Sequence, residues 1–187
     1  LVYLLLQELG FECRSVAVRC ILGRPEPVAL SHRGIVVTFG TEKWYCDVGF
    51  GGNGPKDILK LDTPEIQTLY CERFRVLRED GQYVIVYFDG DTPVRMLKFR
   101  DEAWLDADFA VLNGYYAVHP RSPFRKKRIL YRCTPDGWIG FREHTFLSFR
   151  NGHLETREIP TETEIRRLIQ TKFGLSIPQW ETDGSEN

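Results

Sequence analysis

Hydrophobic and polar residues alternate in several runs along the first hundred positions, which is the pattern of half-buried β-strands. Such runs occupy residues 15–22, 32–39, 42–48, 67–79, 82–88 and 94–99. Two-residue spacers, Gly40-Thr41 and Asp80-Gly81, separate neighbouring runs and predict β-hairpins. This succession of short strands favours an antiparallel barrel or a strongly curled antiparallel sheet.

Helical periodicity appears outside these runs, in three segments at residues 1–9, 101–116 and 162–173. The middle segment fits either a helix or a helix-turn connector. Gly10 and Gly174 follow the first and last helices in the position of a C-terminal stop. Thr161 and Glu164 have the spacing of a capping box, which predicts where the last helix begins.

The segment between the connector and the last helix combines an irregular stretch with short strands. HPRSPF, residues 119–124, contains two prolines and is predicted to be irregular. Strands are predicted within residues 125–134, 138–149 and 153–159, and a polar tail at residues 181–187. The basic run at residues 125–128 fits a solvated strand start, or a site for the phosphates of an anionic cofactor.

The composition is that of an ordinary globular protein, with 42% hydrophobic residues, 27% charged residues and a net charge of −1. This balance argues against a dedicated nucleic-acid-binding protein, because such proteins carry a basic excess. No apolar run approaches the roughly 20 residues that span a bilayer. The five cysteines include no C-x-x-C pair, which disfavours a disulfide framework or zinc site and favours a reducing, cytoplasmic setting.

A histidine and an aspartate stand near the open end of the hairpin that turns at Gly40-Thr41. With a two-residue loop, this register places Asp47 opposite Gly34, and His32 two residues further along on the same face. Side chains on such a diagonal lie roughly 7–8 Å apart at Cβ or somewhat less, so a hydrogen bond can join them. A carboxylate that orients an imidazole prepares it to activate a Ser or Cys nucleophile.

Glycines follow this aspartate closely and allow two interpretations. Gly49, Gly51 and Gly52 would let a ligand approach the backbone, while Phe50 would remain as an aromatic wall. The same stretch also fits a wide turn after a strand. It is not a phosphate loop, because it lacks the G-K-[ST] ending. A histidine and an aspartate at this separation also occur by chance, so spacing alone leaves the catalytic pair a hypothesis.

Four motifs occur together in this chain. They are LxxLGFE at the end of the first helix, a histidine one hairpin before DVGFGG, HPRSPF preceded by DFAVLNGYY, and KFGLSI after the last helix. In this combination the chain resembles the arylamine N-acetyltransferases over essentially its whole length. The histidine, its spacing and DVGFG are the specific part of the resemblance, and the later segments support it.

The resemblance implies an α+β fold of the papain-like Cys-His-Asp acyltransferases. This fold has an N-terminal helical bundle, an antiparallel β-barrel and a C-terminal α/β lid, and only the last helix of the bundle is expected here. The expected parts are the end of the helical domain (1–12), the barrel with the histidine and aspartate (13–100), a connector (101–123) and the lid (124–187).

The resemblance also implies a ping-pong reaction. A cysteine takes the acetyl group of acetyl-CoA and passes it to the nitrogen of an arylamine or arylhydrazine, or to the oxygen of an N-hydroxyarylamine. His32 would be the general base and Asp47 its orienting partner. Acetyl-CoA would be a co-substrate, with no permanently bound cofactor, no metal, and neither nucleic acid nor membrane as partner.

The same likeness assigns residues to the binding surfaces. Phe50 and Phe124 would line the acceptor pocket. The backbone of Gly49, Gly51 and Gly52 would lie near the path of the acyl group and pantetheine.

The chain departs from the family at the nucleophile. The family cysteine lies in an R-G-G-x-C motif shortly before the L-x-x-L-G-F helix, and none of the five cysteines matches that motif. We therefore expect a segment before Leu1 in the native protein, and no activity from this chain alone. Two alternatives stay open: an amide synthase that uses the triad on a larger acyl group, and a non-catalytic ligand-binding relative.

Overall fold

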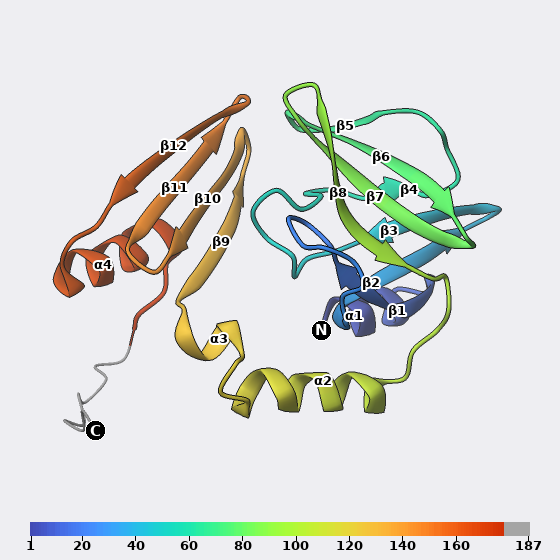
Figure 1. The fold of residues 1–187 in the computed structure, drawn as a ribbon, viewed down its shortest axis with the longest axis horizontal. Helices are drawn as coiled ribbons and strands as arrows, with labels where there is room; N and C mark the ends of the chain where they lie inside the picture. The colour runs from blue at the N-terminus through green and yellow to red at the C-terminus, as the bar shows by residue number, and fades with distance from the viewer. Residues whose placement is uncertain (178–187) are drawn as a thin grey trace.

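A computed structural model describes residues 1–177, apart from the side chains of Pro123 and Lys126. The predicted polar tail lies outside the described residues. Two antiparallel sheets form the framework of the fold, and a helical connector joins them (Figure 1). The first sheet is nearly closed into a barrel, and the second has four strands in the order β12-β11-β10-β9.

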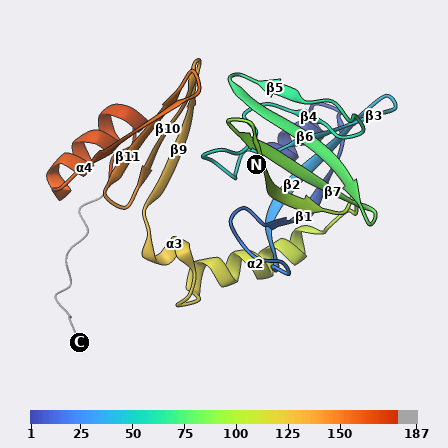
Figure 2. The ribbon, with the colours of Figure 1, turned by 45° about the horizontal axis from the view of Figure 1, so that its top comes forward.

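The barrel sheet has eight strands in the order β4-β3-β2-β1-β8-β7-β6-β5. Its strands are β1 (Glu12–Cys20), β2 (Leu30–Phe39), β3 (Glu42–Cys46), β4 (Leu59–Lys60), β5 (Gln67–Leu69), β6 (Glu72–Glu79), β7 (Gln82–Asp89) and β8 (Thr92–Phe99). Most pairs join strands that are neighbours in sequence. The pairing of β1 with β8 brings the two halves of the sheet together, and Figure 2 shows the resulting curl.

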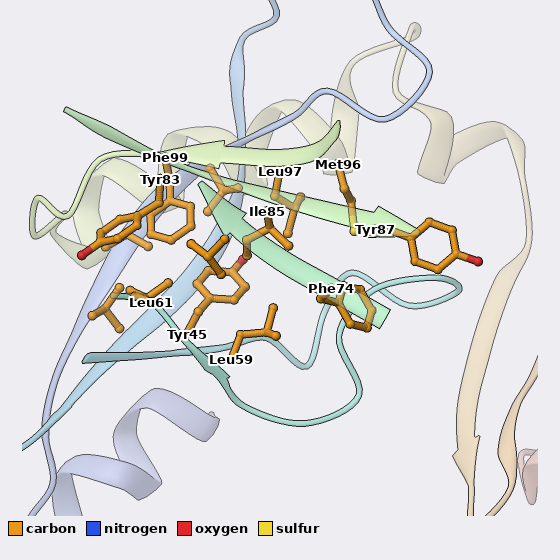
Figure 3. Close-up of a cluster of buried hydrophobic side chains, with 14 residues drawn as sticks. Tyr45, Leu59, Leu61, Phe74, Tyr83, Ile85, Tyr87, Met96, Leu97 and Phe99 are labelled. Atoms are coloured by element: carbon orange, nitrogen blue, oxygen red, sulfur yellow. The ribbon is translucent and has the colours of Figure 1, made fainter. Parts of the chain in front are cut away.

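The inward-facing side chains of this sheet form the main hydrophobic core (Figure 3). Tyr45 stacks on Phe99 at 4.9 Å between ring centroids, and Tyr83 lies 5.4 Å from the same ring. All three rings are at most 1% exposed. Aromatic rings bury large apolar areas, so this cluster fixes the position of the strands that carry it.

The β2–β3 hairpin has the predicted register. Phe39 pairs with Glu42 and Ile35 with Cys46, which confirms the two-residue loop. Gly40 has a φ of +60°, and Thr41 is not among the residues with positive φ, as in a type II′ turn. Because this loop is short, the register of the hairpin is fixed along its whole length.

The second sheet consists of β9 (Ile129–Thr134), β10 (Gly137–Arg142), β11 (Thr145–Arg150) and β12 (His153–Glu158). Helix α4 (Glu162–Leu168) continues into a π-helical turn (Ile169–Phe173) and covers one face of this sheet (Figure 1). Thr161 caps the helix by accepting the Glu164 N–H at 3.3 Å, and Gly174 ends it with a φ of +70°. Both ends agree with the sequence prediction.

Helix α1 (Val2–Glu8) precedes the barrel, α2 (Asp106–Val118) crosses from the barrel to the second sheet, and α3 (Pro123–Lys126) follows it. No helix among residues 1–177 has the length and apolarity needed to cross a membrane.

Helix α3 begins inside HPRSPF, where only irregular structure was predicted. Proline is favourable at the first helical position, which accounts for the start of this helix at residue 123.

Two strand predictions are also wrong in detail. The predicted strand over residues 67–79 is divided by a turn at Tyr70, which has a φ of +56°. The two residues of β4 lie between the predicted strands 42–48 and 67–79, in the stretch from Gly49 to Pro64 whose glycines and prolines indicate a loop, and they pair with β3. A two-residue strand has no alternation to detect, so its Gly- and Pro-rich surroundings dominated the prediction.

Candidate active site

His32 and Asp47 are joined by a hydrogen bond of 2.7 Å between Nε2 and Oδ2. His32 lies in β2, and Asp47 follows directly after β3, so the hairpin register places both on one face. The Asp47 side chain is fully buried, and that of His32 is 17% exposed. When Nε2–H donates to the carboxylate, Nδ1 of the neutral ring carries the lone pair. Within residues 1–177 no hydrogen bond occupies Nδ1.

The Asp47 carboxylate accepts four hydrogen bonds. Oδ2 also accepts the Tyr45 hydroxyl at 2.7 Å, and Oδ1 accepts the backbone N–H groups of Gly49 and Phe50 at 2.9 and 3.1 Å. Burial alone would raise the pKa of Asp47, but the donors, His32 foremost, hold that pKa below its ordinary value. The carboxylate is therefore ionised and oriented near neutral pH.

Tyr45 is a member of the site that the sequence reading missed. Its hydroxyl donates to Asp47, and burial together with that carboxylate raises the pKa of Tyr45 well above its ordinary value. The Tyr45 ring fits only because residue 34 is a glycine: a Cβ at that position would lie 2.5 Å from Tyr45 Cε2. The signal was available in the sequence, since positions 45 and 47 share one face of the hairpin.

A cavity of about 1030 Å³ opens beside this pair, between the barrel, the connector and the second sheet. The structure brings all the sequence-predicted site residues to its lining: His32, Asp47, Gly49, Phe50, Gly51, Gly52 and Phe124. Further aromatic side chains complete the wall, from α2 and the second sheet: Phe109, Tyr116, Tyr131 and Trp138. Such a lining suits an aromatic ligand.

The two predicted phenylalanines occupy different surroundings in this cavity. Phe50 meets the His32 ring edge-on at 5.8 Å between centroids. Phe124 meets the Tyr116 ring at 5.1 Å and is 61% exposed. The first therefore borders the imidazole directly, while the second lies at the more open, connector side of the cavity.

The predicted glycines are approached mainly by protein side chains. A Cβ on Gly49 would lie 3.3 Å from His32 Cε1. Gly51 and Gly52 have φ values of +69° and +49°, and a Cβ there would lie 2.6 and 3.4 Å from the Tyr131 ring of β9. These two glycines thus admit a contact between the loop and the second sheet, which no local sequence pattern indicates.

The cysteines are all free thiols. Cys20 and Cys133 line the cavity, but within the described part of the chain no thiol hydrogen-bonds to His32. Burial raises the pKa of Cys20, and likewise of Cys13 and Cys46. A nucleophilic cysteine needs the opposite shift. The described residues also contain no group of three or more metal-ligating side chains.

Comparison with known proteins extends these observations. The family model described as N-acetyltransferase matches residues 1–181. An arylamine N-acetyltransferase of Escherichia coli is 30% identical over 175 residues, which are 92% of this chain and 62% of that protein. The chain thus spans less than two thirds of the length of this relative.

Solved structures show the same fold. The arylamine N-acetyltransferase from Salmonella typhimurium superposes with a TM-score of 0.86 at 27% identity, over 95% of this chain and 66% of that one. The Mycobacterium marinum arylamine N-acetyltransferase in complex with CoA gives a TM-score of 0.87 at 24% identity, over 92% and 66%.

Proposed function

Because this chain belongs to the arylamine N-acetyltransferase family, we propose that it carries the general base and the acceptor pocket of an acetyltransferase. The reaction would move the acetyl group of acetyl-CoA to the nitrogen of an arylamine or arylhydrazine, or to the oxygen of an N-hydroxyarylamine. The observation that carries the proposal is the His32 Nε2–Asp47 Oδ2 hydrogen bond on the cavity wall.

In this mechanism His32 acts through Nδ1, the ring nitrogen that Asp47 leaves free. Nδ1 takes the proton of a cysteine thiol, and the thiolate attacks the carbonyl carbon of acetyl-CoA. The tetrahedral intermediate collapses to a thioester, and the imidazolium returns its proton to the departing CoA sulfur. Asp47 stabilises that imidazolium and holds the ring orientation throughout.

The second half-reaction reverses these roles. The acceptor amine attacks the acetyl-cysteine carbonyl, and Nδ1 of His32 removes a proton from its nitrogen. The cysteine sulfur leaves and regains its proton. Phe50, which borders the imidazole, would hold the acceptor ring beside the reacting carbonyl, and Phe124 would complete the pocket at its open side.

The nucleophile is part of the proposal. R-G-G-x-C does not occur in this sequence, so we propose that sequence before Leu1 in the complete protein supplies the cysteine. We also extend to this chain, as a co-substrate, the CoA named for the Mycobacterium marinum structure. The Gly49–Gly52 backbone would lie along its acyl arm.

The test uses the complete protein, expressed from its full coding sequence and supplied with acetyl-CoA and an arylamine. We expect parallel double-reciprocal plots, as in a ping-pong reaction, and a cysteine that gains one acetyl group in mass spectrometry. The variant His32→Gln should lose both. A folded complete protein that neither turns over nor becomes acetylated would overturn the proposal.

A further inference from the structure

A second buried charged group lies at the far end of the glycine-rich loop, which comprises residues 48–55. Lys56 Nζ is 3.3 Å from Glu72 Oε2, and the two side chains are 5% and 1% exposed. The ammonium also donates to the backbone carbonyls of Gly52 and Gly54. It lies 5.7 Å from the ring centroid of Trp138. We call Lys56, Glu72 and Trp138 the Lys56 cluster.

These contacts join three parts of the molecule at one atom. Glu72 is the first residue of β6, in the barrel, and Trp138 belongs to β10 of the second sheet. The two carbonyls belong to the loop itself. The Lys56 ammonium therefore ties the loop to both sheets that enclose the cavity.

The pair is costly to bury. Burial lowers the pKa of Lys56 and raises that of Glu72, and each partner opposes the shift of the other. Among the described residues, neither Glu72 oxygen nor Trp138 Nε1 has a hydrogen bond of good geometry. A buried ion pair with incomplete hydrogen bonding contributes little to stability over an apolar pair. The role of the pair is better explained by the position in which it holds the loop.

The loop that Lys56 holds carries Phe50, the aromatic wall of the proposed acceptor pocket. At its beginning the loop is held by the Phe50 N–H, which donates to Asp47. Near its end, Gly54 N–H donates to Gly51 O at 2.9 Å, and a Cβ on Gly54 would lie 2.7 Å from the Phe50 ring. Phe50 thus lies between two fixed points, one of which is the Lys56 ammonium.

We infer that Lys56 is a positioning residue, whose ammonium sets the place of the loop and, through it, of Phe50 beside His32. The consequence for acceptor binding rests on the proposed function, whereas the position of the loop does not. Lys56 also lines the cavity, but its side chain is 5% exposed, so we assign it an effect on the reaction through Phe50 and no catalytic role.

The chain contains a matched control for this cluster. Lys60 pairs with Glu42, and its ammonium lies 5.7 Å from the ring centroid of Trp44. The chemical groups are the same, but these two side chains are 35% and 41% exposed. The two lysines therefore differ mainly in burial and in the loop carbonyls that only Lys56 binds.

The first measurement is amide hydrogen exchange in the complete protein, for the variants Lys56→Met and Lys60→Met. We expect the Phe50 and Gly54 amides to exchange about tenfold faster in Lys56→Met, because the loop carbonyls lose a charged donor. Amides of the β6–β7 ladder should keep their relative protection. Lys60→Met should leave the loop unchanged. Unaltered protection at Phe50 and Gly54 in folded Lys56→Met would overturn the inference.

A double variant guards against loss of folding. Lys56→Met combined with Glu72→Leu leaves no charge buried alone, so it is expected to fold. Its loop amides should still exchange faster, because Gly52 and Gly54 still lack the donor. Wild-type protection in this variant would show that the ammonium does not position the loop.

The second measurement is kinetic and uses the complete protein. In Lys56→Met we expect the acceptor KM to rise about three- to tenfold, while acetyl-CoA hydrolysis without acceptor stays near normal. Equal losses in both activities would assign Lys56 a general structural role and overturn the inference. Faster loop exchange in a protein without acetyltransferase activity would instead leave the loop position standing and refute only the proposed function.

Discussion

Two carboxylates of the barrel, Asp47 and Glu72, are equally buried but differ in their hydrogen bonds and in the direction of their pKa shifts. Their side chains are 0% and 1% exposed, and each faces a basic side chain near the cavity. Asp47 accepts four hydrogen bonds, whereas Glu72 has an ion pair at 3.3 Å and no hydrogen bond of good geometry among the described residues. The pKa of Asp47 is lowered and that of Glu72 is raised.

The difference shows that hydrogen-bond donors, and not the depth of burial, decide whether the pKa of a buried carboxyl group is raised or lowered. Burial raises the pKa of both groups, and only Asp47 has enough donors to reverse the effect. Asp47 can therefore serve as a fixed negative charge that orients an imidazole. Lys56 is the main group that opposes the raised pKa of Glu72, so the charge of Glu72 depends chiefly on the position of that one side chain.

The largest effect that this comparison predicts is on catalysis. Asp47→Asn in the complete protein should lower kcat/KM for acetyl transfer by about 10³- to 10⁴-fold, because the imidazole loses its orienting carboxylate. Asp62→Asn is the control: Asp62 also accepts a tyrosine hydroxyl, from Tyr83 at 2.8 Å, but does not line the cavity. Near-normal turnover by Asp47→Asn would sink the assignment of the pair.

The second prediction concerns stability. At neutral pH, Lys56→Met should lower the free energy of unfolding by about 3–5 kcal/mol, because Glu72 is left charged and buried. Adding Glu72→Leu should recover most of the loss in denaturant titrations. Lys60→Met removes a more exposed pair and should cost less than about 1 kcal/mol. If the double variant were no more stable than the single one, the pair would not be coupled.

The third prediction tests the packing that supports Asp47. Gly34→Ala should cost about 1–3 kcal/mol in unfolding free energy, since the new Cβ would lie 2.5 Å from a buried ring atom of Tyr45. Gly114→Ala in α2 meets no atom within 4 Å and should instead stabilise the protein slightly. Equal stabilities for the two variants would mean that the Tyr45 ring relaxes freely.

The fourth prediction follows from the sign of the pKa shift. A carboxyl group whose pKa is lower in the folded protein stabilises it above the ordinary pKa, and that stability is lost as the pH falls through the folded value. Wild type should therefore lose more stability than Asp47→Asn below about pH 4. Unfolding titrations of both proteins from pH 6 downward measure this. Parallel curves would show that the pKa of Asp47 is not lowered in the folded protein.

The smallest effect is expected at the open side of the cavity. Phe124→Ala should raise the acceptor KM by about three- to tenfold and leave acetyl-CoA hydrolysis unchanged, because this ring is 61% exposed. Phe39→Ala, at a similarly exposed phenylalanine outside the cavity lining, should change neither. Equal losses in acceptor use and hydrolysis would assign Phe124 to the core.

Local rules made part of the site predictable. Alternation and a two-residue turn determine the hairpin register, and the register brings His32 to Asp47. The same rules place Tyr45 beside Asp47, because residues two apart in a strand share one face of the sheet. Most strands of the barrel and the last helix were predictable for the same reason, because their signals lie within a few residues, whereas the pairing of β1 with β8 joins segments far apart in sequence.

The Lys56 cluster was not predictable in this way. Lys56 lies in a loop, where side chains follow no period, and its contacts come from β6 and β10. The contact of Tyr131 with Gly51 likewise depends on how the second sheet meets the barrel. Such contacts arise only from the tertiary arrangement.

The Gly40-Thr41 turn also sets a rule for how this protein can evolve or be engineered. Inserting or deleting one residue there would turn either His32 or the Tyr45–Asp47 pair toward the opposite face of the sheet, whatever residue is chosen. Length changes of two residues preserve the pairing parity, and substitutions leave it untouched. Homologues and designed libraries should therefore change the length of this turn in even steps, and keep at position 40 a residue that tolerates a positive φ.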